Sequence, residues 1–170
     1  MVRRVLAIVV LLAIAALLLV PAGAMAADGV RATLDGRPIS LEKAGQLSCH
    51  DFDFPMLTCY RTSDELLEAI DQRAHPVEGA TSALAVTSGY VVVFQHGAYA
   101  GAAQSISQNY SYLGDIGWND KISSLKSYGA TGKFYEHAPS GGLIYYFYST
   151  SQVTYVGDLY NDKFSSIYFS

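Results

Sequence analysis

The sequence predicts an all-β sandwich in the C-terminal half of the chain, preceded by a small α+β region with one disulfide. Beyond residue 89 helix formers and charged residues become scarce, and most of the 13 tyrosines lie among Val, Ile, Ser and Gly, a composition typical of strands. Short strand candidates follow one another there, each bounded by turn-forming residues. The same region contains an internal repeat, which indicates a duplicated unit of structure.

The first residues have the order of a secretory signal peptide. Arg3 and Arg4 precede an apolar run over residues 5–20, and small residues follow it up to Ala26. A membrane anchor is the alternative, but the run is shorter than the roughly 20 residues that span a bilayer. We therefore expect residues 1–26 to be removed, which leaves a secreted, extracellular protein with no stable membrane anchor.

The mature chain would be acidic. The whole chain has a formal charge of −4, and because the leader carries Arg3 and Arg4 but no acidic residue, its removal changes this charge to −6. The remaining basic residues form no stripe that could neutralise phosphates. Nucleic acid is therefore not expected as a partner.

Residues 27–73 are predicted to form the small α+β region. Residues 30–34 have the composition of a strand. Further on, Thr62 and Glu65 form a capping box, and apolar residues at helical spacing follow it. We predict a short amphipathic helix over residues 63–72.

The only two cysteines, Cys49 and Cys59, lie close together in this region. In an oxidising compartment such a pair is expected to form a short-loop disulfide. The alternative is a reactive thiol beside His50, which would need an unpaired cysteine. Asp51 and Asp53 complete a polar cluster here, but its spacing matches no metal or nucleophile site.

Residues 74–88 are rich in Ala, Ser, Thr and Gly without periodicity, which predicts a linker between the small region and a domain over residues 89–170. Six strands are predicted in that domain, at residues 90–95, 102–107, 122–128, 133–137, 143–148 and 164–169. Strands this short cannot bury a core alone, so they are expected to pack as two sheets.

A hexapeptide, Asn-Asp-Lys-(Ile/Phe)-Ser-Ser, occurs at residues 119–124 and again at 161–166, 42 positions later. It places amide, carboxylate and hydroxyl oxygens on a loop ahead of an apolar strand, and these are the hard ligands that calcium prefers. The alternative is that Asn, Asp and Ser only form turns before a strand. Preservation of Asn, Asp, Lys and both serines in two diverged copies favours the stricter requirement of a calcium site.

The hexapeptide resembles the (Asn/Asp)-(Asn/Asp)-x-x-(Ser/Thr)-Ser clamp of the microbial βγ-crystallin family. Upstream, Phe94, Tyr99 and Gly101 resemble a second signature of that family, aromatic-x4-aromatic-x-Gly on the first hairpin of a motif. The resemblance covers residues 89–170. It implies two Greek-key motifs of four strands each, packed as a sandwich with two calcium sites.

The resemblance also implies which residues bind calcium, since each family clamp is completed by a backbone carbonyl from the first hairpin of the other motif. The first predicted site consists of Asn119, Asp120, the Lys121 backbone, Ser123 and the turn near Glu136. The second predicted site consists of Asn161, Asp162, the Lys163 backbone, Ser165 and the turn near Gln95. With one clamp carboxylate per site, we expect affinities in the roughly 10⁻⁶–10⁻³ M range.

The two predicted sites are not expected to be equal. The second motif keeps the first aromatic residue and the glycine of the hairpin signature but has Ser140 in place of the second aromatic residue. The site completed by this hairpin is predicted to be the weaker one. Replacing Asp162 or Ser165 by alanine should therefore lower calcium-dependent stability more than replacing Asp120.

The sequence predicts no enzyme, because it contains no Gly-rich phosphate loop, no Gly-x-Ser-x-Gly elbow and no His-Glu-x-x-His helix. The expected function is calcium binding that stabilises a secreted domain. The alternative is a secreted metalloproteinase inhibitor or toxin-like antagonist of the same fold, whose partner would be a secreted protease or a cell surface. Those inhibitors tend to carry disulfides in the crystallin region, which this chain lacks.

Overall fold

A computed structural model describes residues 29–75 and 89–170 of the chain. The predicted signal peptide and residues 76–88 of the predicted linker lie outside these ranges. Within the described ranges, no helix has the length and apolar character needed to cross a membrane. Below, residues 29–75 are called the N-terminal unit and residues 89–170 the C-terminal domain.

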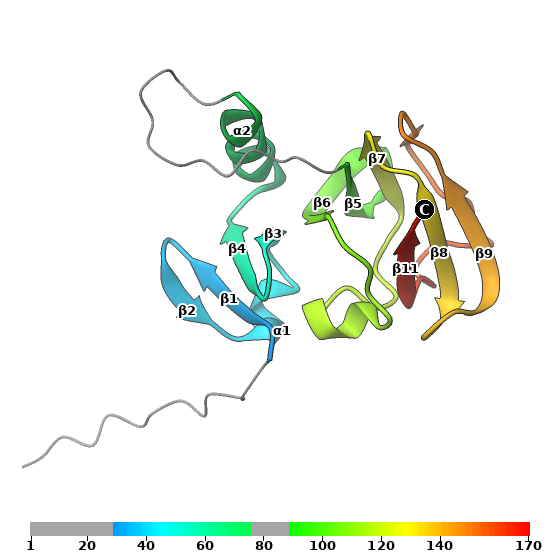
Figure 1. Cartoon of the computed structure of the whole chain (residues 1–170), viewed down its shortest axis with the longest axis horizontal. Helices are drawn as coiled ribbons and strands as arrows, with labels where there is room; N and C mark the ends of the chain where they lie inside the picture. Colours follow the sequence, from blue (N-terminus) through cyan, green and yellow to red (C-terminus); the bar gives the residue numbers. More distant parts are fainter. Residues whose placement is uncertain (1–28, 76–88) are drawn as a thin grey trace, which may run out of the picture.

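Figure 1 shows the order of the elements along the chain. The N-terminal unit contains β1 (Arg31–Leu34), β2 (Arg37–Ile39), α1 (Leu41–Ala44), β3 (Ser48–Asp53), β4 (Met56–Tyr60) and α2 (Ser63–Ala74). The C-terminal domain contains β5 (Tyr90–His96), η1 (Gly97–Tyr99), β6 (Ala100–Ile106), η2 (Leu113–Ile116), β7 (Ser124–Tyr128), β8 (Gly132–His137), β9 (Gly141–Phe147), β10 (Gln152–Val153) and β11 (Ser166–Phe169).

The C-terminal domain is built from two sheets, and this confirms the predicted all-β sandwich. One sheet has the order β10-β7-β5-β6 and continues into the N-terminal unit, while the other has the order β11-β8-β9. Each motif also reaches into the sheet of the other. In one direction β10 pairs antiparallel with β7, and in the other an isolated bridge joins Tyr110 to Ile167. This exchange between the two motifs is the two-motif Greek-key arrangement that the repeat predicts.

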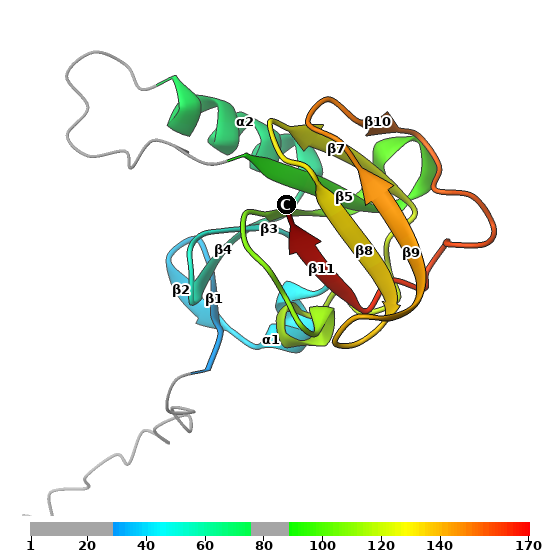
Figure 2. The ribbon, with the colours of Figure 1, turned by 45° about the vertical axis from the view of Figure 1, so that its right-hand side comes forward.

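The N-terminal unit extends the larger sheet of the sandwich. Its strand β3 pairs in parallel with β6, with Cys49 opposite Gln104 and His50 opposite Ser105. The sheet then continues through β4 and β1 to β2, as Figure 2 shows at its blue and cyan edge. The predicted boundary at residues 74–88 thus separates two parts of the chain that share one sheet.

The predicted disulfide is present between Cys49 and Cys59, which face each other across β3 and β4. Both side chains are buried, and the alternative of a reactive thiol beside His50 is therefore wrong. The bond joins the strand that pairs with the C-terminal domain to the rest of the N-terminal unit. The disulfide therefore also resists separation of β3 from β4.

The predicted helix is confirmed as α2, which continues two residues beyond the predicted end. Thr62 is its N-cap and accepts a hydrogen bond from the Glu65 amide. The Glu65 carboxylate accepts from the Arg61 amide instead of from the N-cap residue itself, which still satisfies a free donor at the helix start. The buried face of α2, Leu66 and Ile70, packs against the outer face of the larger sheet.

The principal core is shared by the two parts of the chain. Buried residues of the sandwich and of the N-terminal unit form one apolar cluster that includes Trp118, Phe134, Phe147, Phe164, Val91, Val93, Ala44, Leu47, Leu57 and Cys49. Burial of this common surface favours docking of the N-terminal unit, since apolar area removed from water contributes about 25 cal/mol per Å².

Two predicted strands begin later than expected. Strands β7 and β11 start at Ser124 and Ser166, whereas the apolar pattern placed their starts at Ile122 and Phe164. The carbonyl oxygens of Ile122 and Phe164 accept hydrogen bonds from the opposite repeat copy instead of from a neighbouring strand. Strand β10 was not predicted, because two residues are too few to show an alternating pattern.

Candidate metal centre

The two repeat copies, residues 119–124 and 161–166, form loops that lead into β7 and β11. We call them the first and the second clamp. In each clamp the aspartate has a left-handed backbone, with φ of 55° at Asp120 and 53° at Asp162. Aspartate tolerates this region because its short polar side chain can bond locally. The duplicated sequence is thus a duplicated backbone geometry.

The two clamps are hydrogen-bonded to each other. The Asp120 amide donates to the Phe164 carbonyl oxygen over 3.0 Å, and the Asp162 amide donates to the Ile122 carbonyl oxygen over 3.2 Å. These bonds place the aspartate of each clamp beside the other clamp. The two loops therefore form one paired structure and not two separate binding loops.

Three oxygen atoms from three segments of the chain meet at Ser123. Its hydroxyl oxygen lies 2.7 Å from the Gln95 carbonyl oxygen, to which it donates, and 3.3 Å from Oδ1 of Asp162. A backbone carbonyl, a hydroxyl and a carboxylate are the neutral and anionic oxygen ligands that Ca²⁺ accepts in irregular geometry. These three oxygen atoms are therefore suitable ligands for a calcium ion.

This grouping differs from the predicted one in a single residue. The sequence predicts Ser165, the serine of the same clamp, as the partner of Asp162 and Gln95. In the structure the serine beside Asp162 and Gln95 is Ser123, from the first clamp. The reason is the pairing of the clamps, which brings the aspartate of one copy next to the serine of the other.

The residues of the other half that correspond to Ser123, Gln95 and Asp162 are Ser165, Glu136 and Asp120. The Ser165 amide donates to the Tyr135 carbonyl oxygen over 2.9 Å, as the Ser123 amide does to the Phe94 carbonyl oxygen over 3.0 Å. Ser165 thus lies against the second hairpin as Ser123 lies against the first. Within residues 89–170, however, no hydrogen bond joins the side chains of Ser165 and Asp120.

Glu136 takes part in its own hairpin. Its carboxylate oxygen Oε2 accepts a hydrogen bond from the Leu143 amide over 3.1 Å. Gly142 follows in a left-handed conformation, and a Cβ there would lie 2.8 Å from the same carboxylate oxygen. The Glu136 side chain therefore supports the turn from which the predicted backbone ligand comes.

The first residue of each clamp supports the neighbouring aspartate. Nδ2 of Asn119 donates to Oδ2 of Asp120 over 2.6 Å, and Nδ2 of Asn161 donates to Oδ2 of Asp162 over 2.9 Å. The side-chain oxygen Oδ1 of each asparagine is buried without a hydrogen-bond partner in the described part of the chain. These hydrogen bonds orient the carboxylate of each aspartate within its clamp.

The backbone carbonyls of Lys121 and Lys163 accept no hydrogen bond from any described residue. They remain open to a cation, as the predicted ligand sets require. Nowhere in the described ranges do three or more His, Cys, Asp or Glu side chains gather in a group that could hold a metal. A cation between the clamps would therefore be bound by one carboxylate per site together with neutral oxygens.

The last serine of each clamp has a role that the sequence analysis did not identify. The Ser124 hydroxyl donates to the His96 carbonyl oxygen over 2.6 Å and accepts from the Tyr99 amide over 3.2 Å. Ser166 makes the equivalent, longer contact with the His137 carbonyl oxygen. These serines bind the hairpin turns to the clamps. Their presence in both repeat copies is the feature of the sequence that could have indicated this role.

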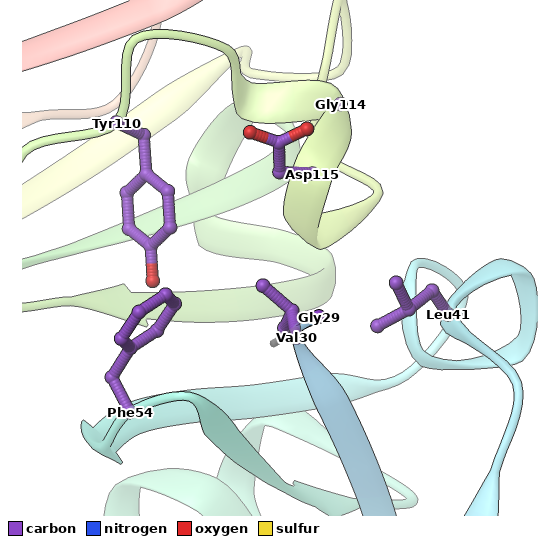
Figure 3. A pocket seen from close by; sticks show the side chains of 7 residues that line it. All are labelled: Gly29, Val30, Leu41, Phe54, Tyr110, Gly114 and Asp115. Carbon is purple, nitrogen blue, oxygen red and sulfur yellow. The ribbon is translucent and has the colours of Figure 1, made fainter. Parts of the chain in front are cut away.

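A pocket of about 540 Å³ lies where the N-terminal unit meets the loop around η2. Figure 3 shows the residues that line it, with the rings of Phe54 and Tyr110 on one side and Asp115 on another. The Tyr110 hydroxyl donates to buried Asp51 over 2.9 Å. No clamp residue lines this pocket, and its lining brings no nucleophile together with a base.

The C-terminal domain is similar to several solved βγ-crystallin domains. A double mutant of a βγ-crystallin domain from Clostridium beijerinckii is 33% identical, the match covering 47% of this chain and 94% of that domain, with a TM-score of 0.43. An archaeal βγ-crystallin is 26% identical over 49% of this chain and all of that protein, with a TM-score of 0.45. A histidine double mutant of clostrillin, solved in complex with nickel, is 29% identical over 47% of this chain and 95% of that one, with a TM-score of 0.42.

No protein-family profile and no curated protein sequence matches the chain. The assignment depends on the 33% identity over nearly the whole clostridial domain, and on the two exchanged motifs with their paired clamps. The chain belongs to the βγ-crystallin family.

Proposed function

We propose that this protein is a secreted, non-enzymatic βγ-crystallin that binds two calcium ions between its clamps and is stabilised by them. The observation that carries the proposal is the meeting of the Gln95 carbonyl, the Ser123 hydroxyl and the Asp162 carboxylate. These atoms come from both motifs, so a cation bound to them would join the two halves of the sandwich.

Calcium would stabilise the fold by neutralising carboxylate charge and by linking the two motifs. Asp120 and Asp162 are exposed carboxylates that face interlocked loops, and a divalent cation would neutralise them. A ligand that binds only the folded state increases the free energy of unfolding by about 2.7 kcal/mol at a hundredfold excess over its Kd. The small number of charged ligands supports a Kd in the roughly 10⁻⁶–10⁻³ M range.

Secretion is proposed from the leader and the disulfide. The order of charged, apolar and small residues over positions 1–26 is that of a signal peptide, and the Cys49–Cys59 bond is typical of proteins that fold outside the reducing cytosol. Extracellular fluids are also the environment in which weak calcium sites become occupied.

Calorimetric titration of calcium into the mature protein tests the proposal, together with thermal melts in calcium and in chelator. We expect about two ions per chain and a higher Tm in calcium, with magnesium giving a smaller shift because it prefers rigid octahedral sites. The Asp120→Asn, Asp162→Asn double variant is the control and should show neither heat nor shift. Absence of both effects in the wild-type protein would sink the proposal.

A further inference from the structure

The N-terminal unit touches both calcium-binding elements of the first motif through one carbonyl group. The Gly45 carbonyl oxygen, at the end of α1, accepts a hydrogen bond from Nε2 of Gln95 over 3.2 Å and another from Nζ of Lys121 over 2.9 Å. Gln95 carries the backbone carbonyl bonded to Ser123, and Lys121 belongs to the first clamp. One atom of the N-terminal unit thus fixes the side chains of two predicted ligand residues.

The backbones approach each other closely at this point. A Cβ on Gly45 would lie 2.8 Å from the Gly117 carbonyl oxygen, and Gly117 has a left-handed φ of 76° at the end of η2. Figures 1 and 2 both show α1 beside the yellow-green helical turn η2. Two residues further on the first clamp begins, so the position of α1 bears directly on the clamp.

The second motif has no such support. Lys163 and Glu136 occupy the positions equivalent to Lys121 and Gln95, yet within the described ranges Lys163 forms no side-chain hydrogen bond or ion pair, and Glu136 bonds within its own hairpin. The contact is therefore a specific addition to one half of a duplicated structure.

We propose that the N-terminal unit positions the calcium ligands of the Gln95 side of the clamp pair, and that its docking and calcium binding are coupled. This inference rests on the proposed function. Gly45, Gln95 and Lys121 are positioning residues: their contacts hold the Gln95 carbonyl and the first clamp in place before the ion arrives. Coupling is reciprocal, so calcium must also hold the N-terminal unit more firmly.

Lys121→Met and Lys163→Met form a matched pair for the test. Each substitution removes one positive charge from a clamp, which by itself tightens calcium binding, but only Lys121→Met removes the bond to Gly45. In calorimetric titrations of the full mature protein, we expect the Kd of one site to rise about fivefold in Lys121→Met, at the lower end of usual couplings. The Kd values of Lys163→Met should stay equal or fall.

Gln95→Met provides a second test, because it keeps the ligand carbonyl and removes only the side-chain donor to Gly45. Its Kd should rise as in Lys121→Met, whereas Gln152→Met, at an exposed glutamine of β10 outside both clamps, should leave both Kd values near those of the wild type. Equal calcium binding in Lys121→Met and Lys163→Met, or unchanged binding in Gln95→Met, would overturn the inference while leaving the proposed function intact.

Hydrogen exchange gives a readout that does not depend on calorimetry. The amides of Ala44, Gly45 and Leu47 are hydrogen-bonded within α1 and the turn after it, and we expect calcium to slow their exchange about fivefold in the wild type. This effect should disappear in Lys121→Met. If calcium protects the clamps but leaves these three amides unchanged, the coupling is refuted. If calcium produces no heat with wild-type protein, the proposed function fails instead.

Discussion

The amide of Asp120 donates a hydrogen bond to the carbonyl oxygen of Phe164, and the amide of Asp162 donates one to the carbonyl oxygen of Ile122. Each clamp thereby holds the other, although 42 positions separate the two copies in the chain. Neither clamp can take its shape without its counterpart. A mutation in one clamp is therefore expected to act on ligands supplied by the other.

The first prediction concerns which serine works with Asp162. In a double-mutant cycle on stability measured in calcium, Ser123→Ala and Asp162→Asn should be non-additive, because both side chains belong to one oxygen group. Ser165→Ala and Asp162→Asn should be additive. Urea denaturation in calcium and in chelator measures both cycles. A coupling found only for Ser165 would restore the pairing expected from the sequence.

The second prediction concerns the same serine without calcium. The Ser123 hydroxyl is buried and bonded to the Gln95 carbonyl over 2.7 Å, so Ser123→Ala should lower the free energy of unfolding in chelator by about 1 kcal/mol. Ser165→Ala is the control, since its hydroxyl makes no hydrogen bond within the described residues. An equal loss of unfolding free energy in Ser123→Ala and Ser165→Ala would contradict this difference between the two serines.

The third prediction concerns the aromatic core. Phe164 is fully buried and packs on Phe134, with ring centroids 4.8 Å apart, and on Tyr145 at 5.5 Å. Phe164→Ala should lower the free energy of unfolding by about 3–5 kcal/mol through lost burial and a cavity. The exposed Tyr148→Ala should change it by less than about 0.5 kcal/mol. Urea denaturation at fixed calcium concentration checks both.

The fourth prediction concerns the disulfide. Cys49 and Cys59 are ten positions apart, and closing a loop of that size restricts the unfolded chain enough to stabilise the fold by about 2–3 kcal/mol. Replacing both cysteines by alanine should lower the free energy of unfolding by at least that amount. Wild-type protein melted after reduction should show a similar loss, and an unchanged Tm in both samples would contradict the prediction.

The fifth prediction concerns pH. His50 is buried beside Phe52, its Nδ1 has no partner in the described part of the chain, and burial lowers its pKa from 6.5 to about 4. The unfolded chain then binds a proton more readily than the folded one between pH 6.5 and 4. Stability should fall as the pH is lowered through this window, by about 3 kcal/mol in total from this group.

The variant His50→Phe isolates that contribution, because phenylalanine keeps the stacking on Phe52 and cannot take up a proton. Urea denaturation at pH 7 and pH 4.5 should give a smaller difference in stability for His50→Phe than for the wild type. The exposed His75→Gln serves as the control and should retain the wild-type difference. An identical pH dependence in all three proteins would rule out His50 as its source.

Local features of the structure could be predicted from the sequence because each depends on neighbouring residues. The capping box at Thr62 and Glu65 marked the start of α2, and close spacing of the two cysteines indicated the disulfide. Repetition of the hexapeptide indicated two equivalent loops. The strand patterns indicate a sandwich, although the apolar character of Ile122 and Phe164 wrongly extends two strands, because a buried apolar residue does not require ladder pairing.

Contacts between distant segments could not be predicted in the same way. Alternation along β3 and β6 shows which side chains are buried, but it does not specify which strand edges pair. The parallel register of Cys49 with Gln104 therefore had no signal in the sequence. The contact of Gly45 with Lys121 likewise depends on where two loops meet, and not on the composition of either loop.

Residue type and spacing are enough to predict two oxygen-rich clamps on a duplicated Greek-key framework, since they define each loop. The tertiary structure decided that Ser123, and not Ser165, lies beside Asp162 and the Gln95 carbonyl, and that α1 supports this side of the pair. A ligand set assembled from both motifs depends on packing between segments that are not neighbours along the chain.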